Sequence, residues 1–128
     1  MKIQIKSRFT SDILFEHDCE NNSIRITLEA AVKARADLYG ADLAGADLAG
    51  ADLGDKEDPV EDIKQVGNIG SRGGFTVAFK CKTSIKIKCG CFFGTIDEFA
   101  EEVRKTHGNN IHGKQYAAAI EFLRKIWA

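Results

Sequence analysis

Residues 36–55 read ADLYG ADLAG ADLAG ADLGD, four consecutive copies of one five-residue unit. Each unit starts with alanine and has a leucine at its third position; the leucines are Leu38, Leu43, Leu48 and Leu53. An amphipathic helix needs apolar residues three and four positions apart and is weakened by frequent glycine, while a half-buried strand needs strict alternation. A period of five fits neither pattern. It predicts a chain that turns a corner in every unit, with alanine and leucine pointing inwards, so that four units close one square coil.

These units resemble the pentapeptide-repeat family, whose pattern is Ala-(Asp/Asn)-Leu-x-x. The resemblance implies a right-handed quadrilateral β-helix in which the four leucines stack at the centre. Members of the family that mimic DNA and bind gyrase have many stacked coils, whereas this sequence has about one. Successive units occupy successive faces of a coil, so their aspartates should point in four directions and not form one acidic stripe. A single coil also leaves its apolar residues open above and below, so flanking segments must cover them.

The segments around the repeats predict an α+β protein. Upstream, residues 2–6 and 12–18 flank a turn and predict a short hairpin. Asn22 or Ser23 can then cap a helix that ends at about Arg35. The β-branched residues at the start of this helix leave a strand as the alternative for its first turn.

A linker is expected at residues 54–59, where turn formers and charged residues surround the only proline. The linker predicts two units: hairpin, helix and coil in residues 1–56, and a C-terminal α+β lobe in residues 57–128. Residues 63–69 are expected to form a short strand at the beginning of that lobe.

Residues 75–93 carry the clearest strand pattern, two alternating runs joined by a short turn. They predict a two-stranded hairpin with one apolar face. The opposite face is expected to carry Lys80, Lys82, Lys86 and Lys88. Thr95 and Glu98 have the spacing of a capping box, which predicts a helix to about Lys105. A last helix is expected over roughly residues 112–127.

The predicted lysine face is the first candidate for a ligand site. Four ammonium groups on two neighbouring strands repel each other unless an anion compensates, which favours the phosphate groups of a nucleotide or nucleic acid. Arg72 precedes this hairpin in a glycine-rich loop and offers a bidentate fork to phosphate. The alternatives are a lysine face that only prevents aggregation, and a plain turn around Arg72.

Cysteines and histidines give weaker signals. Cys81, Cys89 and Cys91 all point to the predicted apolar face, where buried thiols act as small hydrophobic groups; a zinc site is the alternative. His107 lies in a loop rich in asparagine and glycine, where it supports a turn or, alternatively, contacts a ligand. No nucleophile elbow, zinc-protease histidine pair or paired-carboxylate signature occurs. We therefore expect no enzyme, no metal and no cofactor.

Composition limits the class of protein further. The chain has 128 residues, of which 44% are hydrophobic, and a net charge of −1, which suits a globular protein and not a disordered one. Residues 1–62 have a net charge of −7 and residues 63–128 one of +6, which favours docking of the two halves or head-to-tail association of copies. The first six residues alternate in polarity, unlike a secretory signal, and no apolar run approaches the ~20 residues of a membrane span. We expect a cytoplasmic protein with no membrane partner.

The whole arrangement resembles small pentapeptide-repeat proteins encoded by phages and prophages. That resemblance implies an accessory protein that inhibits or sequesters a host factor, such as one of host defence, in the host cell cytoplasm. Our first hypothesis is a homo-oligomer that holds an anionic small molecule or nucleic acid through Arg72, His107 and the four lysines. The second is an inhibitor that presents the acidic N-terminal half to a host protein. Two further alternatives are an enzyme built around His107 and the cysteines, and a structural phage protein.

Overall fold

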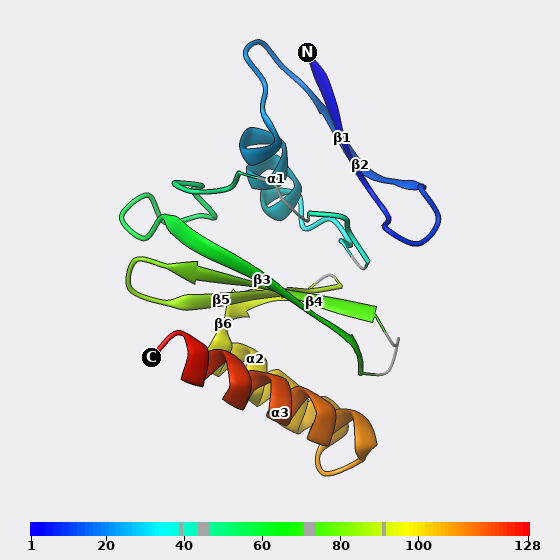
Figure 1. Cartoon of the computed structure of the whole chain (residues 1–128), viewed down its shortest axis with the longest axis vertical. Coiled ribbons are helices and arrows are strands. Elements are labelled where there is room, and N and C mark those ends of the chain that lie inside the picture. Colours follow the sequence, from blue (N-terminus) through cyan, green and yellow to red (C-terminus); the bar gives the residue numbers. More distant parts are fainter. Residues whose placement is uncertain (39, 44–46, 71–73, 91) are drawn as a thin grey trace.

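A four-stranded antiparallel sheet with strand order β3-β4-β5-β6 lies at the centre of the molecule (Figure 1). Its strands are β3 (Val60–Ile69), β4 (Gly74–Cys81), β5 (Ile85–Cys89) and β6 (Phe92–Thr95). The computed structural model describes residues 1–38, 40–43, 47–70, 74–90 and 92–128. Figure 1 shows the N-terminal elements on one side of this sheet and two helices on the other. The α+β class is therefore confirmed, with three helices and two antiparallel sheets in the described part of the chain.

The N-terminal elements follow the prediction. Strands β1 (Lys2–Lys6) and β2 (Ile13–Asp18) form an antiparallel hairpin. Helix α1 (Ile24–Lys33) is capped by Ser23, whose side chain accepts a hydrogen bond from the backbone N–H of Ile26. The helix reading is thus correct from the first turn, because the cap satisfies a backbone donor that a strand would have paired elsewhere.

The two C-terminal helices also form where they were predicted. Helix α2 (Ile96–His107) starts with the expected capping box between Thr95 and Glu98. Helix α3 (Ile111–Ile126) runs beside it and is capped by Asn110. The predicted hairpin is larger than expected, because strand β3 starts at Val60 and pairs with β4, and β6 adds a fourth strand. No helix of the described residues has both the length and the apolar character that crossing a membrane demands.

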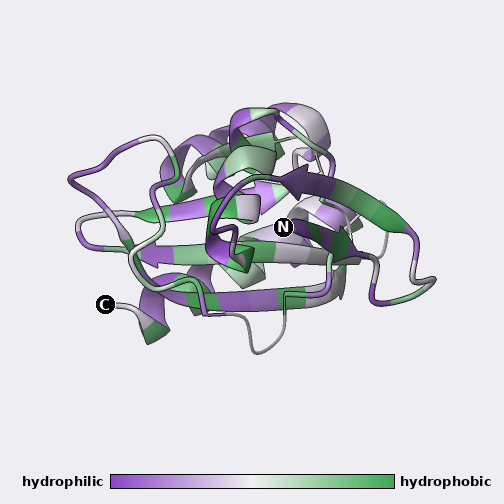
Figure 2. Cartoon of the chain, turned by 90° about the horizontal axis from the view of Figure 1, so that it is seen from above, coloured by the Kyte–Doolittle hydropathy of each residue, from purple (hydrophilic) through white to green (hydrophobic). Residues whose placement is uncertain are grey.

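Two separate hydrophobic cores lie on the two faces of the sheet. The first joins α1, the repeat leucines and the face of β4 that carries Val77 and Phe79. The second joins Ala78 and Ile87 of the sheet with the inner faces of α2 and α3. Figure 2 shows hydrophobic and hydrophilic residues alternating along the strands of the sheet. The first core draws on residues from both sides of the linker, so the repeats are packed against the C-terminal lobe.

The repeat leucines are buried as predicted. Leu38, Leu43 and Leu48 are each 2% exposed and Leu53 is 5% exposed. Two of the expected corners are β-turns closed by hydrogen bonds, from Ala41 N to Leu38 O and from Ala51 N to Leu48 O. Each turn has a glycine with positive φ at its third position, at +70° for Gly40 and +83° for Gly50, as a type II turn requires. Inward leucines and a corner in the unit are therefore features that the five-residue period predicts correctly.

A β-helix, in contrast, is not found among the described residues. The backbone of the repeats bonds to other elements: Asp42 N donates to Lys6 O, and Val60 N donates to Ala51 O. An isolated β-bridge joins Ser7 to Ala41. A β-helix is built from bridges between successive coils, and a single coil has no neighbouring coil of its own kind. The β1–β2 hairpin and strand β3 take the place of such neighbours.

The predicted lysine face is wrong, and the length of one turn is the reason. Cys81 N donates to Ser84 O, so Cys81 lies opposite Ser84 and only the two residues between them form the tip of the turn. The pairing therefore joins odd positions of β4 to even positions of β5, such as Phe79 to Lys86, and Lys80 lies opposite Ile85. A one-residue difference in a connection moves every side chain of a strand to the other face.

The four predicted lysines consequently separate. Lys86 and Lys88 share the face of the first core, and Lys88 is only 1% exposed. Lys80 lies on the opposite face, and Lys82 is exposed in the turn. Cys81 and Cys89 also separate, since Cys81 belongs to the first core and Cys89 packs against the second. The expectation of a common apolar face for the cysteines is therefore wrong as well.

Candidate functional site

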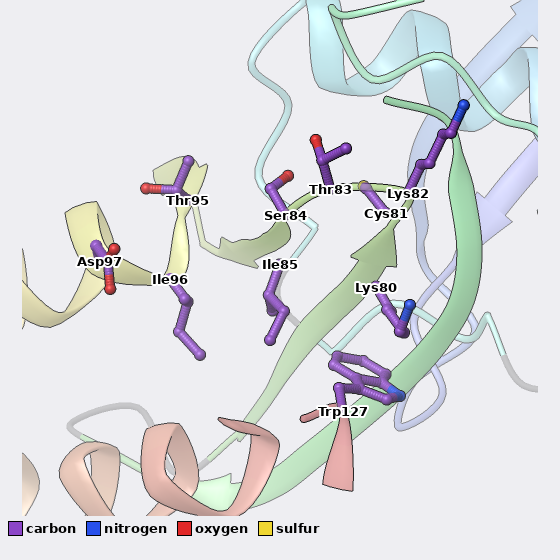
Figure 3. A pocket seen from close by; sticks show the side chains of 10 residues that line it. All are labelled: Lys80, Cys81, Lys82, Thr83, Ser84, Ile85, Thr95, Ile96, Asp97 and Trp127. Carbon is purple, nitrogen blue, oxygen red and sulfur yellow. The ribbon is translucent and has the colours of Figure 1, made fainter. Parts of the chain in front are cut away.

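A groove of about 470 Å³ opens between the β4–β5 turn, the start of α2 and the end of α3 (Figure 3). We call it the Trp127 groove. Its lining residues are Lys80, Cys81, Lys82, Thr83, Ser84, Ile85, Thr95, Ile96, Asp97 and Trp127. The groove thus combines two of the predicted lysines with three hydroxyl groups and the only tryptophan of the chain.

The apolar part of the groove is made by Ile85, Ile96 and Trp127. Figure 3 shows the side chains of Ile85 and Ile96 pointing in the same direction, away from the β4–β5 turn and towards the side of α3. The Trp127 indole is held in place because its Nε1 donates a hydrogen bond of 3.1 Å to Asp62 Oδ2 on β3. The ring is therefore anchored at its edge, which leaves a planar apolar surface beside the groove.

Two acidic residues of β3 set the electrostatics on this side of the groove. Lys80 Nζ lies 2.8 Å from Glu61 Oε1, and this hydrogen bond raises the pKa of Lys80. Burial opposes ionisation of Asp62, but hydrogen bonds from the Ile63 N–H and from Trp127 outweigh it and lower its pKa. Lys80 is thus held positively charged and in a defined position, while Lys82 remains exposed.

The start of α2 closes the far side. Thr95 accepts a hydrogen bond from Glu98 N, and Thr95 N donates to Glu98 Oε1. Asp97 forms an ion pair with Arg124 of α3. The first turn of α2 therefore has its own partners, and the cations that line the groove are Lys80, which is paired with Glu61, and Lys82.

A buried carboxylate supports the turn that carries Lys82. Asp58 is 4% exposed and accepts hydrogen bonds from Thr83 N and from the Ser84 hydroxyl. Lys86 Nζ lies 4.0 Å from Asp58 Oδ2, the oxygen that also accepts from Ser84. Burial would raise the pKa of Asp58, but the hydrogen bonds from Ser84 and Thr83, with the charge of Lys86, outweigh it and lower the pKa. Asp58 thus ties the linker to the groove.

We expect Asp58→Asn to lower the free energy of unfolding by about 1–3 kcal/mol at pH 7, because an amide cannot accept both hydrogen bonds with a full charge. The folded pKa lies below the ordinary value of 3.8, so the stabilisation is complete well above 3.8 and is lost as the pH falls below 3.8 through the lower folded pKa. Urea denaturation of both proteins at pH 7 and pH 3 measures this. A difference in stability as large at pH 3 as at pH 7 would contradict the assignment.

The other predicted site residues lie away from the groove. His107 is at the opposite end of the sheet, where its ring centroid lies 5.7 Å from that of His112 and 5.7 Å from that of Tyr116. Gly70 lies against Tyr116, one of these three rings, and its N–H donates to Oε1 of the neighbouring Gln115 at 2.8 Å. Arg72 lies outside the described residues, two positions beyond Gly70. The predicted ligand residues are therefore not brought together in one place.

The cysteines show no grouping with other metal ligands. Burial raises the pKa of the Cys81 thiol, which favours its neutral form. Cys89 Sγ lies 3.5 Å from Thr76 Oγ1 and 3.9 Å from Tyr116 Oη. Cys91 lies outside the described residues. Within the part of the chain that the structure describes, no three His, Cys, Asp or Glu side chains are close enough to hold a metal ion.

Sequence reasoning missed two residues that shape the groove. Trp127 has helical spacing with the core residues of α3, so the sequence predicts it to be part of the core. Asp58 stands in a charged, turn-forming linker, where a buried acceptor has no signature. The one sequence feature beside Asp58 is Pro59, which directly follows it. In the structure Pro59 O accepts a hydrogen bond from Lys82 N, and this bond brings the linker beside the turn.

Comparison with known proteins bears on the repeats. Residues 29–55 match the family described as pentapeptide repeats (8 copies). The chain carries a pentapeptide-repeat segment. The match begins inside α1, so the first residues of this pentapeptide-repeat segment, 29–33, are helical. No curated protein and no solved structure matches the chain.

Proposed function

We propose that this is a non-enzymatic binding protein that holds an anionic ligand, a nucleotide or nucleic acid, in the Trp127 groove. The observation that supports this most is the position of Lys80 beside an anchored indole ring, with Lys82 in the turn at the other end of the groove (Figure 3). A phosphate group gains charge-assisted hydrogen bonds from lysine, and a base gains stacking on tryptophan. The volume of the groove falls in the range of about 300–1,000 Å³ that is usual for small-molecule sites.

One hydroxyl group adds a donor for an anion. Thr95 lines the groove opposite the turn, and its hydroxyl can donate to a phosphate oxygen without adding charge. The side chains of Thr83 and Ser84 are hydrogen-bonded to Asp58. Asp97 also lines the groove, but Arg124 balances its charge.

For the whole protein we propose an oligomeric phage or prophage accessory protein that sequesters such a ligand, as part of countering a host factor in the host cytoplasm. The pentapeptide-repeat segment contributes support, as one coil of a quadrilateral β-helix whose leucines pack between α1 and the sheet. The open coil ends that favoured an oligomer are covered within the chain, because the repeat leucines belong to the first core. The split of charge between the halves still favours an oligomer.

A second candidate function is inhibition of a basic host protein by the acidic N-terminal half. The observation that favours it is exposure of the aspartates in three repeat units, Asp37, Asp42 and Asp47. This candidate predicts that a host protein is captured equally well by variants altered in the Trp127 groove. A structural role in a phage particle is the third reading, and it predicts large assemblies in solution.

The test uses the single tryptophan as a reporter of the groove. We expect titration with mononucleotides to change Trp127 fluorescence, and Lys82→Glu to weaken binding about 10- to 100-fold, because one favourable charge becomes unfavourable. Lys105→Glu is the matched control, since Lys105 is also exposed in the C-terminal lobe but does not line the groove. Calorimetry on the same variants provides a second measurement.

Two results would count against this function. One is the absence of any fluorescence or calorimetric response to nucleotides and oligonucleotides at low salt. The other is an equal loss of affinity in Lys82→Glu and Lys105→Glu, which would indicate general attraction to the basic lobe. A steep decrease of affinity with salt would favour a nucleic-acid polymer over a mononucleotide.

A further inference from the structure

Helix α3 has an apolar stripe that no other element of the chain covers. Ile111, Phe122 and Ile126 are 66%, 50% and 42% exposed, and they are half of the six large hydrophobic side chains that are exposed in the described part of the chain. Ala118 is exposed as well. At 100° per residue these four positions lie on one side of the helix, away from the side that carries Tyr116, Ile120 and Leu123. We call them the α3 stripe.

The position of the helix makes the α3 stripe accessible. The inward side of α3 carries the buried residues Tyr116, Ala119, Ile120 and Leu123. Of these, Tyr116, Ile120 and Leu123 belong to the second core. Figure 1 shows α2 and α3 as the outer layer on the far side of the sheet from the N-terminal hairpin and α1. Single exposed apolar residues are common on protein surfaces, but a row of them along four turns of one helix is typical of an interaction surface.

We propose that the α3 stripe binds the same stripe of a second copy, with the two α3 helices antiparallel about a twofold axis between Tyr116 and Ala117. This register places Ile111 against the partner subunit's Phe122, and Gln115 against the partner subunit's Ala118. The small residue at Ala118 lies close to the axis, where the two helices must approach most closely, and the large residues lie at both ends. The stripe is therefore complementary to itself in size.

Charge supports the same register. Lys114 and Glu121 flank the α3 stripe on one side, and the twofold axis brings Lys114 beside the partner subunit's Glu121, twice per dimer. Lys114 is exposed and makes no ion pair within the described part of the chain. Glu121 already pairs with Lys125 on its own helix, with 3.1 Å between Lys125 Nζ and Glu121 Oε1, and both side chains are well exposed. A parallel pair would instead place Lys114 and the partner subunit's Glu121 on opposite sides of the contact, so only the antiparallel dimer forms these two charge pairs.

The size of the stripe limits the strength of this dimer. In this register the two α3 helices overlap over residues 111–122, about three turns, and Ile126 lies beyond the end of the partner helix. Such a contact is smaller than the ~800 Å² per partner of a standard stable interface. The dimer is therefore expected to dissociate in the micromolar range and to exchange readily. It uses residues outside the Trp127 groove, so it forms without a ligand, and its failure would leave the proposed binding of an anionic ligand in that groove untouched.

Sedimentation equilibrium over a range of protein concentrations tests the proposal. We expect a monomer–dimer equilibrium that Phe122→Asp weakens at least tenfold. Ile13→Asp is the matched control, because Ile13 of the N-terminal hairpin is exposed to a similar degree, 52%, and lies outside the α3 stripe. Lys114→Glu alone should weaken the dimer, and adding Glu121→Lys should restore it, because the reversed pair has the same geometry.

Three outcomes would overturn the proposal. The first is a wild-type protein that stays monomeric at several hundred micromolar. The second is a dimer that Ile13→Asp weakens as much as Phe122→Asp does. The third is a double charge reversal that weakens the dimer as much as Lys114→Glu alone. Circular dichroism of each variant shows whether the helices remain folded, so that loss of the dimer is separated from loss of the fold.

Discussion

Gly70→Ala is expected to lower the free energy of unfolding by about 3 kcal/mol. Gly70 ends strand β3 with φ at +82°, a conformation that costs an alanine roughly 1–2 kcal/mol. A Cβ atom at this position would lie 1.9 Å from Tyr116 Oη and 2.2 Å from Tyr116 Cζ. Tyr116 cannot retreat easily, because it is buried and packs edge-on against Phe99 with 5.5 Å between the ring centroids. The steric term therefore adds to the backbone term.

A second glycine separates these two terms. Gly50 has nearly the same φ, +83°, but a Cβ there would meet only Arg25 Nη1, at 3.5 Å. Gly50→Ala should therefore cost about 1 kcal/mol, the backbone term alone. Urea denaturation followed by circular dichroism measures both variants. If the two substitutions cost the same, then Gly70 does not pack on Tyr116 as the structure shows, and the end of β3 is not fixed by α3.

Local signals along the chain predicted most of the secondary structure. Ser23, Thr95 and the repeat leucines each act within a few residues, through a capping hydrogen bond or through the period of the repeat, so the sequence carries that information directly. The helices and the buried leucines were accordingly found at their predicted places. Strand β6, with four residues, was missed because it is too short to show a pattern of its own.

Long-range relations were less predictable. The lysine face depended on whether two or three residues form the tip of the β4–β5 turn, and the residues near Thr83 are compatible with both lengths. That one difference buries Lys88 and moves Lys80 to the other side of the sheet. Asp58 and Trp127 enter the candidate site only through contacts with residues 25 and 65 positions away. Such contacts are decided by packing, which a single sequence does not reveal.

The way the repeats are covered also explains how so short a repeat segment can be stable. Repeat units bury their apolar residues only against neighbours, so a short segment needs substitutes on both sides. Here the N-terminal hairpin bonds to Gly40 and Asp42, and strand β3 bonds to Gly50 and Ala51. The repeat segment is thus part of the fold of the whole chain.

This arrangement leads to the second large effect, which is expected for Leu48→Ala. Leu48 is 2% exposed in the first core, so removing its side chain leaves a cavity and should cost about 2–5 kcal/mol. If the coil were only an appendage, it could collapse around the smaller residue, and the cost would be far lower. Leu28→Ala in α1 is the matched comparison, because Leu28 lies in the same core and is fully buried.

The shape of the unfolding transition gives a further criterion. Because the first core joins α1, the repeats and β4, we expect Leu48→Ala to shift a single transition seen both by circular dichroism and by Trp127 fluorescence. Ile13→Ala, at an exposed position, should change the midpoint little. Two separate transitions, with only the one sensed by circular dichroism moved, would mean that the repeats unfold independently of the lobe that contains the Trp127 groove. A common shift would instead make the pentapeptide-repeat segment a structural support of that groove, because both faces of the sheet would then lose their packing together.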